Sequence, residues 1–131
     1  MATTTSAIIM FGFQNGNSYE YYLDTVSVVD NSASTIQLLN NPNFENSTTT
    51  ATSWVQWCTS TCSSVSGQIT SGTNCYLPTG NCFMDGCDAP GIDFLGQSFS
   101  TLIGHNYTVS FWLKLSNGGF PNANRFYADI V

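Results

Sequence analysis

The stretch YTVSFWLKL, residues 107–115, decides the fold class of this chain. Its apolar residues recur at every second position, which is the period of a β-strand with one buried face. The apolar face consists of Val109, Phe111, Leu113 and Leu115. The opposite face consists of Thr108, Ser110, Trp112 and Lys114. This segment therefore predicts a strand that covers a hydrophobic core.

Strand-like segments recur along the rest of the chain. Short apolar runs, separated by turns rich in Asn, Gly, Pro and Ser, lie at residues 8–13, 20–29, 35–39, 53–58, 81–86, 92–100 and 126–131. No window of about eleven or more residues keeps an uninterrupted helical period. The Gly/Asn/Pro loop between 107–115 and 126–131 predicts that these two strands form a hairpin. About eight short strands of this kind predict an all-β jelly-roll sandwich.

The composition excludes two classes of partner. The chain has 131 residues, enough for one domain with a sizeable core. Only 8% of the residues are charged, and two basic residues stand against eight acidic ones, which gives a net charge of −6. Nucleic acids and anionic membranes attract basic patches, so we expect neither as a partner.

Five cysteines fall in one window that is otherwise rich in Ser, Thr, Gly and Asn: Cys58, Cys62, Cys75, Cys82 and Cys87. No CxxC pair occurs, and the single histidine, His105, lies outside the window, so the spacing does not match a zinc site. A disulfide framework is expected instead, and with it an extracellular location. Short loops favour Cys58–Cys62 and Cys75–Cys82, with Cys87 free or bonded to a neighbouring chain, but other pairings are open.

Two sequons agree with secretion, Asn46-Ser47-Thr48 and Asn106-Tyr107-Thr108, and predict glycans on Asn46 and Asn106. The opening MATTTSAIIMFGF lacks a basic segment and a long apolar run, so it does not resemble a signal peptide. We therefore expect the chain to be a piece or a processed product of a longer secreted protein.

Four segments carry a resemblance to a known family. NNPNFEN at 40–46 resembles the opening motif of calcium-containing jelly-roll modules of the galactose-binding-like class, which includes many carbohydrate-binding modules. YLDTVSV at 22–28 resembles their closing strand. SWVQWC at 53–58 and FLGQSFSTLIGHNYTVSFWLKL at 94–115 resemble their early and central strands. The chain is also similar to Cys-containing tandem repeats of long secreted invertebrate proteins.

The order of these segments is permuted, because the closing strand precedes the opening motif. By this resemblance, residues 1–30 are the closing strands of a jelly roll, residues 31–35 are a linker, and residues 36–131 are the body. Three arrangements satisfy this order. In the first, the chain folds back on itself. In the second, it is a segment of a tandem array that is cut between repeats. In the third, residues 1–30 complete the sheet of a neighbouring molecule by strand addition.

The resemblance also implies a structural calcium ion held by Glu45 and Asp24. Two departures weaken this implication: Pro42 stands where the family usually has Gly, and Thr25 where a second Asp is common. The acidic loop at 85–93 is a second oxygen-rich segment, but its spacing matches no EF-hand, and we expect a solvated turn there. Carbohydrate binding needs exposed aromatic faces, for which Trp112, Trp54 and Trp57 are candidates, with Trp112 favoured by its place opposite the apolar face.

The sequence lacks the usual motifs of hydrolases and nucleotide-binding enzymes, so we do not expect an enzyme. The favoured function is a structural repeat or subunit of an extracellular filament or matrix, assembled head-to-tail with copies of itself. The alternative function is a carbohydrate-binding module that uses exposed aromatic side chains.

Overall fold

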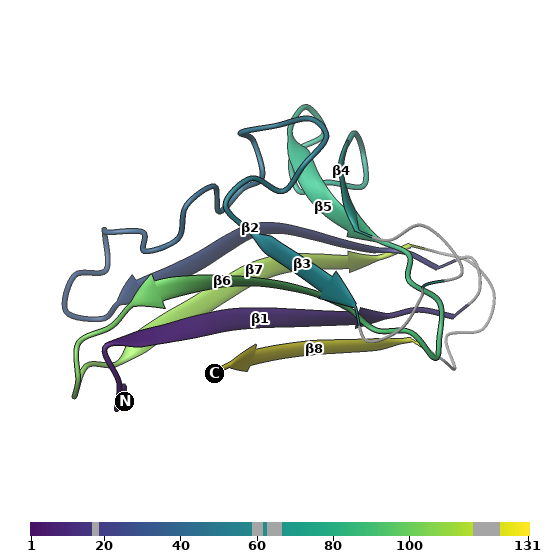
Figure 1. The fold of residues 1–131 in the computed structure, drawn as a ribbon. Helices are drawn as coiled ribbons and strands as arrows, with labels where there is room; N and C mark the ends of the chain where they lie inside the picture. The colour runs from purple at the N-terminus through teal and green to yellow at the C-terminus, as the bar shows by residue number, and fades with distance from the viewer. Residues whose placement is uncertain (17–18, 59–61, 63–66, 117–123) are drawn as a thin grey trace.

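The computed structural model describes residues 1–16, 19–58, 62, 67–116 and 124–131, and it consists of β-strands joined by turns and loops (Figure 1). The strands are β1 (Ser6–Gln14), β2 (Tyr21–Asp30), β3 (Val55–Cys58), β4 (Gln68–Ser71), β5 (Asn81–Asp85), β6 (Asp93–Ser100), β7 (Tyr107–Leu115) and β8 (Arg125–Ile130). Within these residues there is no helix, and hence none that is long and apolar enough to cross a membrane.

The strands form two antiparallel sheets of four, ordered β3-β6-β1-β8 and β4-β5-β2-β7. The chain crosses between the sheets after β1, β2, β3, β5, β6 and β7, so the two sheets are interleaved in sequence. Their inner faces share one hydrophobic cluster. The predicted all-β sandwich is therefore confirmed, whereas the more specific jelly-roll connectivity stays a prediction.

The period-2 pattern of the sequence builds the core. On β1, Phe11 and Phe13 point inward and are fully buried, as is Phe83 on β5 of the other sheet. The rings of Phe13 and Phe83 lie 5.6 Å apart across the sandwich. Burying one such side chain stabilises the fold by about 1.5–3 kcal/mol. The aromatic residues of the strands thus hold the two sheets together.

Residues 1–30 lie inside the sheets of their own chain. β1 pairs with β6 on one side and with β8 on the other. β2 pairs with β5 and β7 in the second sheet. The pairing of β1 with β8 continues beyond the strand, where the Ile8 and Val131 amides each donate to the other's carbonyl. In this structure of one chain, residues 1–30 therefore pair with strands of the same chain, and the choice among the three arrangements stays a prediction.

Two expectations about the strands are wrong, and one strand was not expected. β7 and β8 do not form a hairpin, because β7 pairs with β2 and β8 pairs with β1 in opposite sheets. Residues 35–39 form no strand; instead the Leu38 amide donates to the Val28 carbonyl, and the Gln37 side chain accepts from the Val28 amide. The sequence also fails to predict the short strand β4, because four residues with a single buried apolar side chain, Ile69, give too little periodicity to detect.

Candidate functional site

One row of residues crosses the outer face of the β3-β6-β1-β8 sheet. Trp57 on β3 lies opposite Phe94 on β6. Gly12 on β1 lies opposite Phe94 on one side and opposite Tyr127 of β8 on the other. Cross-strand partners project to the same face, and this face is opposite to the one that buries Phe11. We call the three aromatic side chains of this row, Trp57, Phe94 and Tyr127, the aromatic strip.

Glycines beneath the aromatic strip let its rings lie against the sheet. A Cβ atom at Gly12 would be 3.0 Å from the ring of Phe94 and 3.1 Å from that of Tyr127. A Cβ at Gly96 would be 3.1 Å from the ring of Trp57. The Trp57 and Phe94 rings are stacked, with centroids 5.5 Å apart and planes 18° from parallel. The Trp57 and Phe94 rings therefore lie close over the backbone of the sheet as a stacked pair, with the Tyr127 ring beside Gly12.

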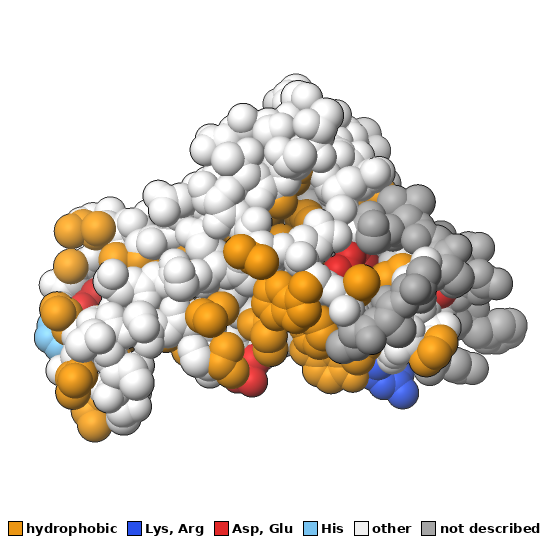
Figure 2. Space-filling view, viewed as in Figure 1, with side chains coloured by type: hydrophobic (Ala, Val, Ile, Leu, Met, Phe, Trp, Pro, Cys, Tyr) orange, Lys and Arg blue, Asp and Glu red, His pale blue; other side chains and the backbone are white. Residues whose placement is uncertain are grey.

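The strip is open to solvent. Trp57 is 41% exposed and Tyr127 is 45% exposed, which is high for side chains of this size. Beside the strip is a shallow hollow of about 590 Å³, lined by Met10, Ile92, Phe94, Phe126, Tyr127, Ala128 and Asp129. In Figure 2, hydrophobic side chains gather over the region where Figure 1 places β6, β1 and β8.

Polar groups stand at the β8 end of the strip. Arg125 and Asp129 lie two residues before and after Tyr127, so alternation places all three on the same face. Gln14 on β1 lies opposite Arg125, and Met10 lies opposite Asp129. The face thus combines flat apolar rings with a guanidinium, a carboxylate and an amide, all of which hydrogen-bond to hydroxyl groups.

The other two tryptophans are covered. Trp54 is 8% exposed, packs against Phe44, and donates its indole N–H to the Asn41 carbonyl at 3.0 Å. Trp112 is half-buried on the outer face of the second sheet, where its ring lies 5.9 Å from that of Tyr76. Of the three tryptophans named from the sequence, the structure thus leaves Trp57 the most open. Phe94 and Tyr127 were missed, although their alternation with Leu95 and Phe126 could have placed them on the outer face.

Asp24 and Glu45, the pair expected to hold calcium, lie near each other. Asp24 accepts hydrogen bonds from the amides of Thr25 and Tyr76, and Glu45 accepts one from the Asn81 amide, so both carboxylates hold the loop that runs from Tyr76 to Asn81. Burial raises the pKa of Asp24, and the nearby Glu45 carboxylate raises it further. Two carboxylates fit part of a calcium ligand set, since calcium takes six to eight oxygens. Within the described ranges, no group of three or more His, Cys, Asp or Glu side chains forms a metal site.

The opening motif and the closing strand meet at a β-bulge in β2. Thr25 has φ of 51°, and the register with β7 shifts between Asp24 and Ser27. The displaced Val26 amide donates to the Pro42 carbonyl at 2.9 Å. The Pro42 carbonyl is thus bound by the backbone of β2.

Two disulfides are present among the described residues, and they are nested. Cys75–Cys82 has the expected pairing, and Cys62–Cys87 encloses it. The expected Cys58–Cys62 bridge is wrong: Cys58 is an exposed free thiol at the end of β3. Cys87, expected to be free or bonded to a neighbouring chain, is fully buried in its bridge. A short sequence separation does not predict the partner of Cys62, because the loop after β5 brings Cys87 back to the segment that precedes β4.

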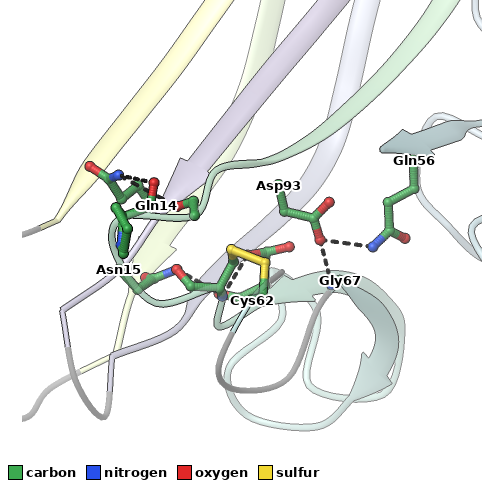
Figure 3. Close-up of a disulfide and its surroundings, with 10 residues drawn as sticks. Gln14, Asn15, Gln56, Cys62, Gly67 and Asp93 are labelled. Carbon is green, nitrogen blue, oxygen red and sulfur yellow. Dashed lines mark hydrogen bonds between the residues drawn. A yellow bond between two sulfur atoms is a disulfide. The ribbon is translucent and has the colours of Figure 1, made fainter. Parts of the chain in front are cut away.

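The acidic loop is not a solvated turn at either end. Asp85 on β5 is 0% exposed and Asp93 on β6 is 1% exposed, which corrects the expectation from sequence. Asp93 accepts hydrogen bonds from the Gln56 side chain and the Gly67 amide, beside the Cys62–Cys87 bridge (Figure 3). Burial, followed by the adjacent Asp93 carboxyl, raises the pKa of Asp85 to about 8. Alternation with inward-facing Phe83 and Leu95 was the signal that could have revealed this pair.

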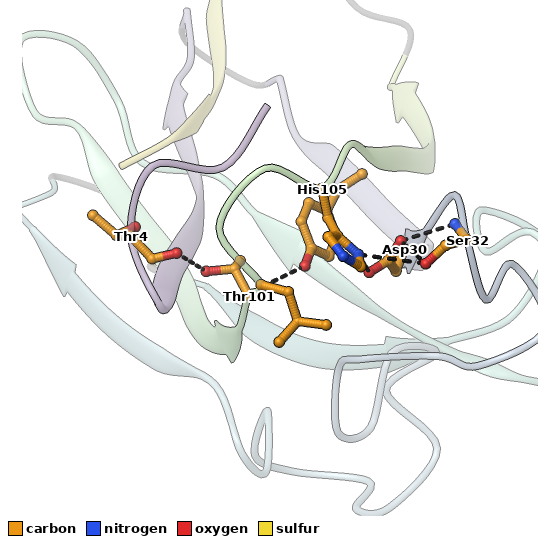
Figure 4. A network of polar contacts seen from close by, with 7 residues as sticks. Thr4, Asp30, Ser32, Thr101 and His105 are labelled. Carbon is orange, nitrogen blue, oxygen red and sulfur yellow. Dashed lines mark hydrogen bonds and ion pairs between the residues drawn. The ribbon is translucent and has the colours of Figure 1, made fainter.

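A polar cluster lies at the opposite end of the sandwich (Figure 4). His105 Nδ1 is 2.6 Å from Asp30 Oδ2, and the Ser32 hydroxyl donates to Asp30 Oδ1 at 2.7 Å. Because Ser32 and Asp30 both face the same ring nitrogen, the three side chains lack the relay order of a hydrolase triad. The cluster joins the turn after β2 to the loop before β7.

Both sequon asparagines are at the surface. Asn46 follows the opening motif and Asn106 precedes β7, and both side chains are exposed. The Thr108 hydroxyl of the second sequon donates to the Asn31 side chain at 2.8 Å. Glycosylation at either position stays a prediction.

Comparison of the chain with protein-family models, with curated proteins and with solved structures found no match.

Proposed function

We propose that this chain is an extracellular binding module that holds polysaccharide on the aromatic strip. The observation that carries the proposal is the row of Trp57, Phe94 and Tyr127 on the solvent face of one sheet. Flat aromatic rings contact the apolar faces of sugar rings, and neighbouring polar groups bind sugar hydroxyls. Neighbouring strands are about 4.8 Å apart, so the row is about 14 Å long and accommodates more than one sugar ring.

Other features of the chain agree with this proposal. The nested disulfides are typical of proteins in oxidising compartments. The net charge of −6 and the polar composition suit a module that works in the presence of neutral glycans. The resemblance to galactose-binding-like modules supports the same class of ligand.

The test is retention on columns of insoluble polysaccharides such as cellulose, chitin and mannan. Trp57→Ala and Tyr127→Ala are expected to weaken retention, and loss of a central aromatic anchor costs about 2 kcal/mol, or roughly 30-fold in affinity. Trp112→Ala is the matched control, because this ring lies on the other sheet and packs against Tyr76. Equal retention of wild type and Trp57→Ala, or a loss confined to Trp112→Ala, would contradict the proposal.

A second candidate function is the structural subunit of a filament or matrix. β7 and β8 are edge strands of the two sheets, and the rings of Phe111 and Phe126 on them lie 5.7 Å apart. Inward-facing Phe111 and Ile130 are nevertheless 37% and 45% exposed. An apolar hollow of about 440 Å³ lies nearby, between Ala7, Phe99, Val109 and Val131.

Exposed edge strands are sites of strand addition from another chain. The partner in this case is a copy of the same chain added head-to-tail, which produces a filament when the contact does not close. Because β1 and β2 are already paired on both sides, addition at the β7 and β8 edge is a more accessible route than exchange of residues 1–30. Sedimentation and electron microscopy test this candidate, with Ile130→Lys expected to leave monomers that still bind sugar.

A structural calcium ion at Asp24 and Glu45 is part of the proposal. Its place would be beside the loop from Tyr76 to Asn81, where the ion would offset the repulsion between the two carboxylates. It would tie the opening motif to β2 and would not take part in sugar binding, because the aromatic strip lies on the other sheet.

A further inference from the structure

The contact between Asp85 and Asp93 joins the two sheets through their acidic side chains. Asp85 belongs to β5 in one sheet and Asp93 to β6 in the other. The two carboxyls are within hydrogen-bonding reach of each other, and both are almost completely buried. Two buried carboxylates in contact repel each other strongly, whereas one proton between them forms a short hydrogen bond.

The donors around the pair leave one oxygen for that proton. Asp85 Oδ1 accepts the Cys87 amide at 2.9 Å. Asp93 Oδ2 accepts both the Gly67 amide and the Gln56 side chain, each at 2.9 Å. Among the described residues, Asp85 Oδ2 has no hydrogen-bond donor, although it is fully buried. A proton on the pair satisfies this oxygen, and without the proton it stays unsatisfied at a cost in stability.

Among the residues that the structure describes, the groups that face the pair do not supply a compensating positive charge. Asp93 on β6 is the charged group that acts on Asp85, together with the amides of Cys87 and Gly67. On β2, Tyr21 is the ladder partner of Asp85, and Arg125 of β8 acts on the Tyr21 hydroxyl. On β3, the neutral Gln56 side chain binds Asp93.

We propose that Asp85 and Asp93 form a proton-dependent latch between the two sheets, closed while the carboxyls share one proton and released when that proton is lost. The shared proton links β5 to β6, and through Asp93 it also holds the Gln56 side chain of β3 and the backbone at Gly67. Loss of the proton places two negative charges in contact inside the sandwich. The end of the sandwich beside the Cys62–Cys87 bridge then loosens, while the bridge limits how far the strands separate. This latch does not depend on the proposed sugar binding.

The first test compares thermal unfolding of wild type, Asp85→Asn and Asp129→Asn at about pH 5 and about pH 9, in buffer with a chelator. In Asp85→Asn the new side-chain amide donates to the Asp93 carboxylate at every pH, so this variant keeps the contact without a titrating proton. Wild type is expected to lose roughly 5 °C or more in melting temperature between the two pH values, and Asp85→Asn is expected to lose much less. Asp129→Asn removes the same charge from an exposed position on β8 and is expected to behave as wild type.

The second test uses the wild-type protein and needs no variant to fold. Carbon-13 NMR follows the carboxyl carbons of Asp85 and Asp93, and amide hydrogen exchange follows Gly67 and Cys87. The latch is supported if the pair titrates near neutral or alkaline pH and if the Gly67 and Cys87 amides exchange faster above the pH of that titration. Complete ionisation of both carboxyls below about pH 5, or equal pH dependence in wild type and Asp85→Asn, overturns it.

Discussion

Trp57 and Phe94 are ladder partners on neighbouring strands, and their rings stack at 5.5 Å on the solvent face of the sheet. A stacked aromatic pair on a sheet is normally covered by a second layer, because each ring has a large apolar surface. Here the glycines at positions 12 and 96 leave room beneath the rings, and the Trp57 ring remains 41% exposed. The glycines let the pair approach the sheet closely, and the exposed part of the Trp57 ring remains free to contact a ligand.

Gly12→Ala tests whether the close approach of these rings to the sheet matters for binding. The new methyl group would lie 3.0 Å from the ring of Phe94 and 3.1 Å from that of Tyr127, so both rings must tilt away. Polysaccharide retention is expected to fall, whereas the melting temperature should change little, because both contacts are on the surface. Ser98→Ala, further along β6 at an exposed position, is the control. Unchanged retention in Gly12→Ala would mean that sugar binding does not need the rings of Phe94 and Tyr127 in these positions.

Gly67→Ala is expected to destabilise the fold. A Cβ atom there would lie 2.0 Å from Cζ of the Phe83 ring, which is buried in the core. Overpacking of this kind costs roughly 1–3 kcal/mol. Chemical denaturation measures the loss of unfolding free energy. Gly67→Ala should cost less in a Phe83→Leu background, and an equal loss in both backgrounds would show that the clash with the ring is not the cause.

The two disulfides are expected to contribute unequally. Their sequence separations are 25 residues for Cys62–Cys87 and 7 residues for Cys75–Cys82. In the chain-entropy account, the longer loop stabilises by about 3 kcal/mol and the shorter by about 1 kcal/mol less. Denaturation of the paired Cys→Ala variants measures this order. A thiol reagent should label one site, Cys58, in the native protein, and labelling of a second cysteine before unfolding would contradict the pairing.

Stability is expected to depend on pH with opposite signs at the two ends of the sandwich. Hydrogen bonds from Ser32, aided by His105, lower the pKa of Asp30 to about 2, so its contribution is present above the unfolded pKa of about 4 and is lost as the pH falls toward 2. The raised pKa of Asp85 acts in the other direction, since the folded state holds a proton that the unfolded state releases above about pH 4. Unfolding free energy should therefore be highest in weak acid and fall as the pH rises toward 8. Denaturation at a series of pH values measures this profile, and a maximum above pH 8 would contradict it.

Calcium is expected to raise the melting temperature if Asp24 and Glu45 bind it. Stabilisation grows with calcium concentration and reaches about 2.7 kcal/mol at a hundredfold excess over the dissociation constant. Asp24→Asn and Glu45→Gln should both abolish the increase in melting temperature. Glu20→Gln is the control and should retain it, because the Glu20 carboxylate accepts a hydrogen bond from the Tyr22 hydroxyl and is not part of the expected site. The same increase in all variants would place any calcium effect elsewhere in the molecule.

Several features of the site could be read from the sequence only in part. Trp57 was one of three tryptophan candidates, because alternation gives the face of a strand but not what covers that face. Trp112 has the same alternating position, yet the loop that carries Tyr76 and the Cys75–Cys82 bridge packs on its side of the sheet. Asp85 and Asp93 were expected at the surface because charge usually stays in water, but the fold brings hydrogen-bond donors to both, namely the Cys87 and Gly67 amides and the Gln56 side chain.

The sequence by itself determined the all-β class, the position of most strands and the inward face of β7, and it favoured the Cys75–Cys82 bridge among pairings that stayed open. These properties follow from period-2 patterning and from short loops, which are local. Only the tertiary structure decided that β7 and β8 belong to opposite sheets, that Cys62 pairs with Cys87, and that Trp57, Phe94 and Tyr127 share one row. Each of these depends on which strands become neighbours, and that choice is made by the packing of the whole core and not by any one segment.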